Sequence, residues 1–175
     1  AQAGQEFDIV TGETVRRGVI EKIHEDAVEF SLYEEVAAAE SLPLIFAMSI
    51  IRFERMEWAI EKLTELGIAR IVPVIAQRSE KHLTQAAAKR VERWRRIAHE
   101  SAQQSRRSSV PEIADPLPLP LWLKEKQEGL RLLLSEQERD QSLRTCLEAE
   151  PDRHSAQNPR AKNIYAAIGP EGGWT

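Results

Sequence analysis

The residues best suited to bind a ligand lie near the end of the chain, in Ile168-Gly-Pro-Glu-Gly-Gly173. The apolar run at 164–168 is typical of a buried strand. Glycines directly after a strand allow positive φ angles and let a ligand lie against backbone N–H groups. The spacing fits neither a Walker A loop nor a GxGxxG fingerprint, which argues against a nucleoside triphosphate or NAD. Taken alone, the segment is equally compatible with ordinary glycine turns.

A second candidate is Leu132-Leu-Leu-Ser-Glu136, where another apolar run ends in polar residues. Ligands of open α/β sheets bind beyond the carboxyl ends of the strands. We therefore expect the two segments to line one pocket, with an apolar floor and backbone donors. An ordinary turn remains the alternative for the Leu-Ser-Glu segment.

A third candidate, Gln77-Arg-Ser-Glu-Lys81, follows the apolar run at 71–75. An arginine at the carboxyl end of a strand can clamp a phosphate or stabilise developing negative charge. Arg78 is the candidate for that role. The alternatives are a solvated loop or an ion pair between Arg78 and Glu80.

The net charge is −4, but residues 89–107 hold seven basic side chains against two acidic ones. Lys89, Arg93 and Arg96 fall on one outward face at helical spacing. Such a local field attracts polyanions, and phosphate groups would contact that face. The alternative is a solvated face opposite a core stripe that includes Val91 and Trp94.

The sequence gives no sign of a disulfide framework, a metal site, a hydrolase site or a membrane span. The single Cys146 excludes an internal disulfide framework, and the four histidines show no metal-ligand spacing. Neither a nucleophile elbow nor a close carboxylate pair is present. No apolar run approaches the length of a membrane span. We therefore expect a cytoplasmic protein with no metal and no membrane partner, whose chemistry depends on a reactive cofactor.

Strand and helix patterns alternate from Pro43 onward, which predicts a mostly parallel sheet with helices on both faces. Because Pro73 lacks an N–H donor, it should lie at an edge or a bulge. We expect strands at 44–48, 71–75, 130–134 and 163–168, and helices at 55–66, 84–107, 119–127 and 139–149.

The first 40 residues differ from the rest, with short strands expected at 7–10, 15–23 and 27–32 and a bulge at Gly18. This predicts two domains, 1–40 and 41–175. A ligand loop followed by nothing suggests that the chain is a piece of a longer protein.

The ordered set of motifs from about Leu42 to the end resembles the 16S ribosomal RNA uridine N3-methyltransferases, which are SPOUT-class enzymes. The similarity rests on Arg55-Met-Glu-Trp-Ala-Ile-Glu-Lys-Leu-Thr-Glu-Leu-Gly-Ile68, Arg78-Ser79, Arg93-Trp94, Glu100-Ser-Ala-Gln-Gln-Ser-Arg106 with Val110-Pro111, Leu133-Leu-Ser-Glu136, and Ile168-Gly-Pro-Glu-Gly-Gly173. The resemblance implies an α/β trefoil-knot domain whose knot segment is absent here, preceded by a partial PUA-like β-barrel. The sequence departs from the family pattern at Ile50-Ile-Arg-Phe53, where the family usually has a Lys-Gly-Asp-type turn.

The resemblance also implies a cofactor, S-adenosylmethionine, a homodimer with sites at the subunit interface, and 16S ribosomal RNA of the small subunit as partner. Arg78 would be catalytic, stabilising the anion that forms at uridine N3. The implied cofactor-binding residues are Leu133, Leu134, Ser135, Glu136, Ile168, Gly169, Pro170, Glu171, Gly172 and Gly173. The expected RNA-binding residues are Lys81, Lys89, Arg93, Arg96, Arg106 and Arg107.

Two other functions stay open at this point. One is another SPOUT methyltransferase that acts on a ribose 2′-oxygen or a guanine. The other is a non-catalytic RNA-binding or ribosome-assembly module. No general base can be identified; Glu171 is a candidate, but it could instead cap its loop.

Overall fold

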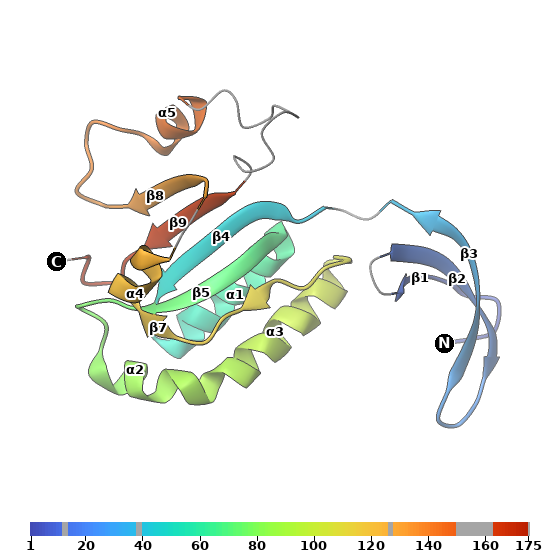
Figure 1. Cartoon of the computed structure of the whole chain (residues 1–175). Helices are drawn as coiled ribbons and strands as arrows, with labels where there is room; N and C mark the ends of the chain where they lie inside the picture. Colours follow the sequence, from blue (N-terminus) through green and yellow to red (C-terminus); the bar gives the residue numbers. More distant parts are fainter. Residues whose placement is uncertain (12–13, 38–39, 126–127, 150–162, 175) are drawn as a thin grey trace.

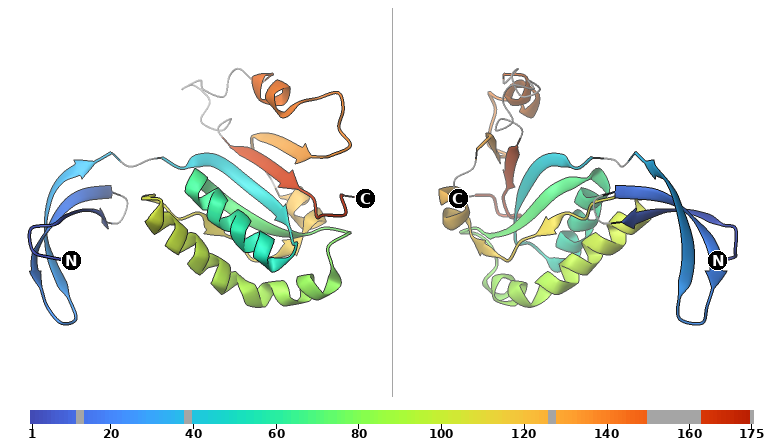
Figure 2. Two further views of the ribbon diagram at one scale, coloured as in Figure 1. Left: turned by 180° about the vertical axis from the view of Figure 1, so that it is seen from behind. Right: turned by 45° about the vertical axis from the view of Figure 1, so that its right-hand side comes forward.

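The computed structural model describes residues 1–11, 14–37, 40–125, 128–149 and 163–174. In these residues it contains a small antiparallel sheet, β1-β2-β3, and a larger sheet of order β6-β5-β4-β9-β8, with β7 also paired to β5. Figures 1 and 2 show the small sheet beside the larger one rather than stacked on it.

The small sheet consists of β1 (Glu6–Thr11), β2 (Thr14–Ile23) and β3 (Val28–Val36). The predicted bulge is confirmed, because the β2–β3 register shifts between Arg16 and Gly18. A Cβ atom at Gly18 would collide with the side chain of Ile9 on β1. Glycine at this position therefore leaves the room that the end of the Ile9 side chain occupies.

The larger sheet is parallel, and its long strands are β4 (Leu42–Ser49), β5 (Ile68–Ile75), β8 (Leu130–Leu134) and β9 (Ile164–Ile168). Two short strands, β6 (Glu112–Ile113) and β7 (Leu117–Pro118), pair in turn with β5 and were not predicted. Pro73 lies on β5 between the residues paired with β6 and those paired with β7. Ile71 O accepts from Ala114 on that side. The backbone groups of residues 71 and 73 point to the same side of β5. The N–H that Pro73 lacks would therefore face the gap between β6 and β7, where it would have no strand to bond.

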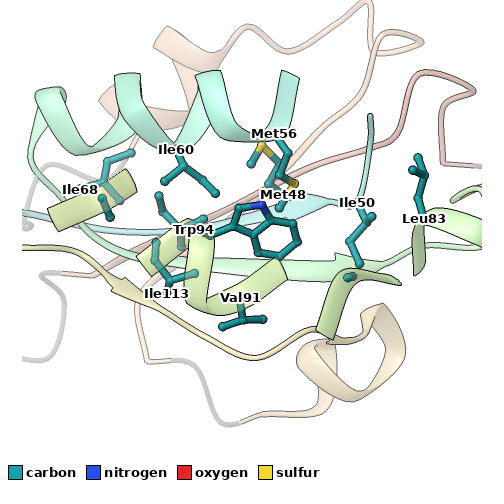
Figure 3. Packing of buried hydrophobic residues seen from close by; sticks show 12 residues of the cluster. Met48, Ile50, Met56, Ile60, Ile68, Leu83, Val91, Trp94 and Ile113 are labelled. Carbon is teal, nitrogen blue, oxygen red and sulfur yellow. The ribbon is translucent and has the colours of Figure 1, made fainter. Parts of the chain in front are cut away.

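One face of the sheet is covered by α1 (Phe53–Leu66), α2 (Lys81–Ala87), the 3₁₀ turn η1 (Ala88–Arg90) and α3 (Val91–Gln104). Their apolar side chains surround the fully buried Trp94, as Figure 3 shows. On the other face, Trp122 of α4 (Leu119–Lys124) packs with Ala47, Val72 and Ala167. Figure 1 places α5 (Leu143–Glu148) beyond β8.

The prediction of one helix over 84–107 was wrong, since η1 separates α2 from α3 and the helix ends at Gln104. Buried positions 83, 87, 91, 94 and 98 keep helical spacing through the 3₁₀ turn, so periodicity carries no sign of the break. Arg106 adopts a positive φ of 55° and ends the helical path.

The helix expected at 139–149 covers only Leu143–Glu148. The Glu138 carboxylate accepts the N–H groups of Asp140 and Gln141, and Ser142 caps the helix by accepting from Thr145 N at 3.1 Å. These bonds satisfy the backbone of residues 140–141 outside a helix. The helix expected at 119–127 ends at Lys124, and residues 126–127 lie outside the described ranges.

Candidate functional site

The two loops predicted to share a pocket do meet. Strands β8 and β9 are parallel neighbours in register, with Leu134 opposite Ile168, so their carboxyl ends are flush. Between the loops that follow lies a cleft of about 700 Å³. Of the residues predicted to bind the cofactor, only Gly172 does not line it. The nine that do are Leu133, Leu134, Ser135, Glu136, Ile168, Gly169, Pro170, Glu171 and Gly173.

A tight turn shapes one wall of the cleft. Gly173 N donates to Pro170 O at 2.9 Å, and Gly173 has a φ of +78°. A Cβ atom there would lie 3.2 Å from Glu136 Oε1 of the facing loop. At Gly172 a Cβ atom would make only an ordinary 3.5 Å contact with Arg78 Cδ. Gly173 is thus the position where both backbone angle and space call for glycine.

Trp174 joins the two loops, and sequence reasoning missed it. Its indole Nε1 donates to Leu134 O at 2.8 Å. A Cβ atom at Gly169 would lie 3.2 Å from the indole ring, so Gly169 lets the ring pack closely. Trp174 also lines the cleft and packs against the core cluster on the α4 face. The signal available in the sequence was a large aromatic directly after a glycine turn.

Three carboxylates line the cleft, from Glu136, Glu138 and Glu171. The N–H groups of Asp140 and Gln141 lower the pKa of Glu138 by hydrogen bonding to its carboxylate. Gln141, Leu143 and Cys146 also reach the cleft but were not predicted. An anionic rim beside apolar side chains suits a ligand that has both a cationic and an apolar part.

Two arginines contact the loop Gly169–Gly173, which we name the glycine loop, but do not line the cleft. Arg78 Nη1 donates to Gly172 O at 2.6 Å, and Arg55 Nη1 lies 3.0 Å from Glu171 Oε1. Arg78 follows β5 as predicted, yet it does not pair with Glu80, whose carboxylate lies 3.5 Å from His82 Nδ1. Glu171 therefore has a cationic partner on α1.

A family model described as an RNA methyltransferase domain matches residues 38–175. The chain belongs to this RNA methyltransferase family.

Two similar proteins are both named ribosomal RNA small subunit methyltransferase E. The protein from Bacillus subtilis is 29% identical over 162 residues, covering 89% of this chain and 61% of the relative. The protein from Aquifex aeolicus is 31% identical over 125 residues, covering 71% of this chain and 48% of the relative. The chain thus spans about 61% or less of these curated relatives.

Solved structures also resemble the whole chain. The ribosomal RNA small subunit methyltransferase E of Neisseria gonorrhoeae, bound to S-adenosyl methionine, has a TM-score of 0.74 and 26% identity, covering 100% of this chain and 69% of that one. A Legionella pneumophila protein solved with the bound cofactor SAM has a TM-score of 0.75 and 26% identity, with the same coverage.

Several basic residues expected to bind RNA in this methyltransferase-family chain have partners within the protein. Arg93 donates to both oxygens of Glu57 at 2.7 and 2.8 Å, and Arg107 donates twice to Glu65 O. Arg96 Nε lies 3.7 Å from the Glu100 carboxylate. The other three, Lys81, Lys89 and Arg106, form no ion pair with the described residues.

Within the described ranges, no group of three or more His, Cys, Asp or Glu side chains is placed to hold a metal ion. None of the helices there is both long and apolar enough to span a bilayer.

Proposed function

We propose that this protein transfers a methyl group from S-adenosylmethionine to N3 of a uridine in 16S ribosomal RNA of the small subunit. The observation that carries the proposal is the cleft at the flush ends of β8 and β9, between the two predicted cofactor loops. Membership of the RNA methyltransferase family and the similarity to a SAM-bound ribosomal RNA methyltransferase support it.

The residues of the cleft fit the cofactor. Its volume of about 700 Å³ lies within the range of small-molecule sites. S-adenosylmethionine carries positive charge on its sulfonium and its α-ammonium group, which the carboxylates of Glu136, Glu138 and Glu171 would balance. Leu134, Ile168 and Trp174 offer apolar surface for the adenine ring. When bound, the cofactor supplies an electrophilic methyl group.

Arg78 would support the nucleophile. Uridine N3 keeps its proton at neutral pH, so attack requires loss of that proton and stabilisation of the resulting anion. Arg78 is exposed, and among the described residues only its Nη1 donates, to Gly172 O, which leaves further N–H groups for the anion. Glu171 remains a candidate base, and its pairing with Arg55 equally supports a role in shaping the loop.

The finer features implied by the resemblance are part of the same proposal. They are a SPOUT domain of the trefoil-knot type, a partial PUA-like RNA-binding domain at 1–40, a homodimer with sites at its interface, and action in the cytoplasm. Two separate sheets, joined near residue 40, support the domain division. Lys81, Lys89 and Arg106 are the expected RNA contacts that keep no ion pair among the described residues.

The test is methyl transfer from isotope-labelled S-adenosylmethionine to small ribosomal subunits that lack the modification. Nucleosides from the digested 16S RNA are then separated and identified by mass. We expect label in N3-methyluridine. Label in a 2′-O-methylated nucleoside or a methylguanine would favour the other SPOUT activity, and absence of label would favour the non-catalytic module.

A further inference from the structure

A second cavity, of about 560 Å³, lies between the first turn of α1 and the junction of η1 with α3. Its lining includes Arg52, Phe53, Glu54, Glu57, Arg90 and Arg93. We name it the arginine pocket. The first turn of α1 also contacts the glycine loop, because Arg55 in that turn pairs with Glu171 of the loop.

The three arginines of the arginine pocket differ in how closely they are paired with carboxylates. Arg93 and Glu57 form a bidentate pair, which raises the pKa of Arg93 and lowers that of Glu57. Arg90 stands 4.7 Å above the Phe53 ring, and its Nη1 is 3.8 Å from Glu57 Oε1. In the described part of the chain, Arg52 has no ion pair.

The pocket is therefore suited to one further negative charge. Three arginines face two glutamates, Glu57 and Glu54, and Glu57 is already held by Arg93. Stacking on Phe53 orients the Arg90 guanidinium before a ligand arrives. Guanidinium groups bind phosphate oxygens through paired hydrogen bonds, so a singly charged phosphodiester matches the pocket in both charge and chemistry.

We propose that the arginine pocket binds a backbone phosphate of the substrate RNA close to the target nucleotide, through Arg52 and Arg90. This inference rests on the methyltransferase function proposed above. Because Arg55 in the first turn of α1 contacts the glycine loop, a base held at that loop would bring the neighbouring RNA backbone toward this turn. The phosphate contact fixes the strand's register there, and it carries no sequence information itself.

The experiment measures binding of a 16S RNA transcript as a function of KCl concentration. The proteins compared are wild type, Arg52→Ala, Arg90→Ala and the control Lys124→Ala. Lys124 is an exposed cation at the end of α4, on the opposite face of the sheet. Each lost phosphate contact should reduce the slope of log affinity against log salt by roughly 0.7, with about tenfold weaker binding at low salt.

We expect both pocket variants to show the smaller slope, Lys124→Ala to match wild type, and calorimetry to give an unchanged affinity for S-adenosylmethionine. Wild-type slopes in both pocket variants, while wild type binds RNA, would overturn the pocket assignment alone. If wild type bound no RNA, the proposed function itself would fail. Arg52 is exposed, and its side chain makes no hydrogen bond or ion pair with the other described residues, so Arg52→Ala remains decisive if Arg90→Ala unfolds.

Discussion

At the scale of single residues, Trp174 links the two loops that line the cleft. Its indole contacts the Leu134 carbonyl, packs against Gly169 and lines the cleft at the same time. A hydrogen bond between the loops fixes their spacing before a ligand binds. Less conformational entropy is then lost on binding.

Trp174→Phe keeps an aromatic ring but removes the N–H donor to Leu134. We expect about fivefold weaker binding of S-adenosylmethionine, corresponding to roughly 1 kcal/mol for one lost hydrogen bond. Calorimetric titration measures the dissociation constant. Trp58→Phe is the matched control, because Trp58 lies on α1 and is 64% exposed. Equal affinities in the two variants would mean that Trp174 does not shape the site.

Arg78 is proposed to act on the anion, although it also holds Gly172 O. Arg78→Ala should lower kcat by about 100-fold or more, as removal of a charge-stabilising donor does. The dissociation constant for the cofactor should change far less, because Arg78 does not line the cleft. Single-turnover methylation together with calorimetry separates the two effects. Unchanged turnover in Arg78→Ala would refute the catalytic assignment.

At the scale of elements, the pair between Glu57 and Arg93 clamps α1 to α3. Hydrogen bonding from Arg93 lowers the pKa of Glu57 below its ordinary value of 4.5. The carboxylate thus contributes stability that is fully present above pH 4.5 and is lost as the pH falls through the lowered pKa.

Glu57→Gln should lower the free energy of unfolding at pH 7 by about 1 kcal/mol, since a bidentate pair is replaced by weaker contacts. The loss should shrink as the pH falls below 4.5, because wild type then loses the same pair. Urea unfolding at several pH values measures both effects. Glu54→Gln is the control, as Glu54 forms no ion pair among the described residues. A pH-independent deficit in Glu57→Gln would contradict the clamp.

Elements with a strong periodic pattern were predictable. The long strands and α1 follow from apolar runs and from Gly67, which ends α1 with a φ of 82°. Strands β6 and β7 were not, because two residues cannot show alternation. The role of Arg107 was also hidden, since its bonds to Glu65 O join positions 42 residues apart. The features that the sequence did not predict are therefore short elements and contacts between residues far apart in the sequence.

At the scale of the whole molecule, the site comes from the strand order. Parallel neighbours β8 and β9 bring together loops from about residues 135 and 170, as the motifs led us to expect. The arginine pocket likewise joins residues near 52 and 90. No local pattern shows that Arg93 turns inward to Glu57 while Arg90 stacks on Phe53. Side-chain partners of this kind depend on tertiary packing.

The proposed function depends on S-adenosylmethionine binding in the cleft between the β8 and β9 loops. Two neighbouring glycines test it directly. A methyl group at Gly173 meets both a φ of +78° and the Glu136 carboxylate, whereas one at Gly172 meets only ordinary contact with Arg78. The strain of a left-handed residue is of order 1–2 kcal/mol.

The measurement is calorimetric titration of S-adenosylmethionine into wild type, Gly172→Ala and Gly173→Ala. We predict saturable binding to wild type, similar affinity for Gly172→Ala, and about tenfold weaker binding for Gly173→Ala, because the free loop relaxes from the left-handed conformation and binding must restore that strain. Absence of binding to wild type, or equal affinities for all three proteins, would contradict the assignment of this cleft as the methyl-donor site.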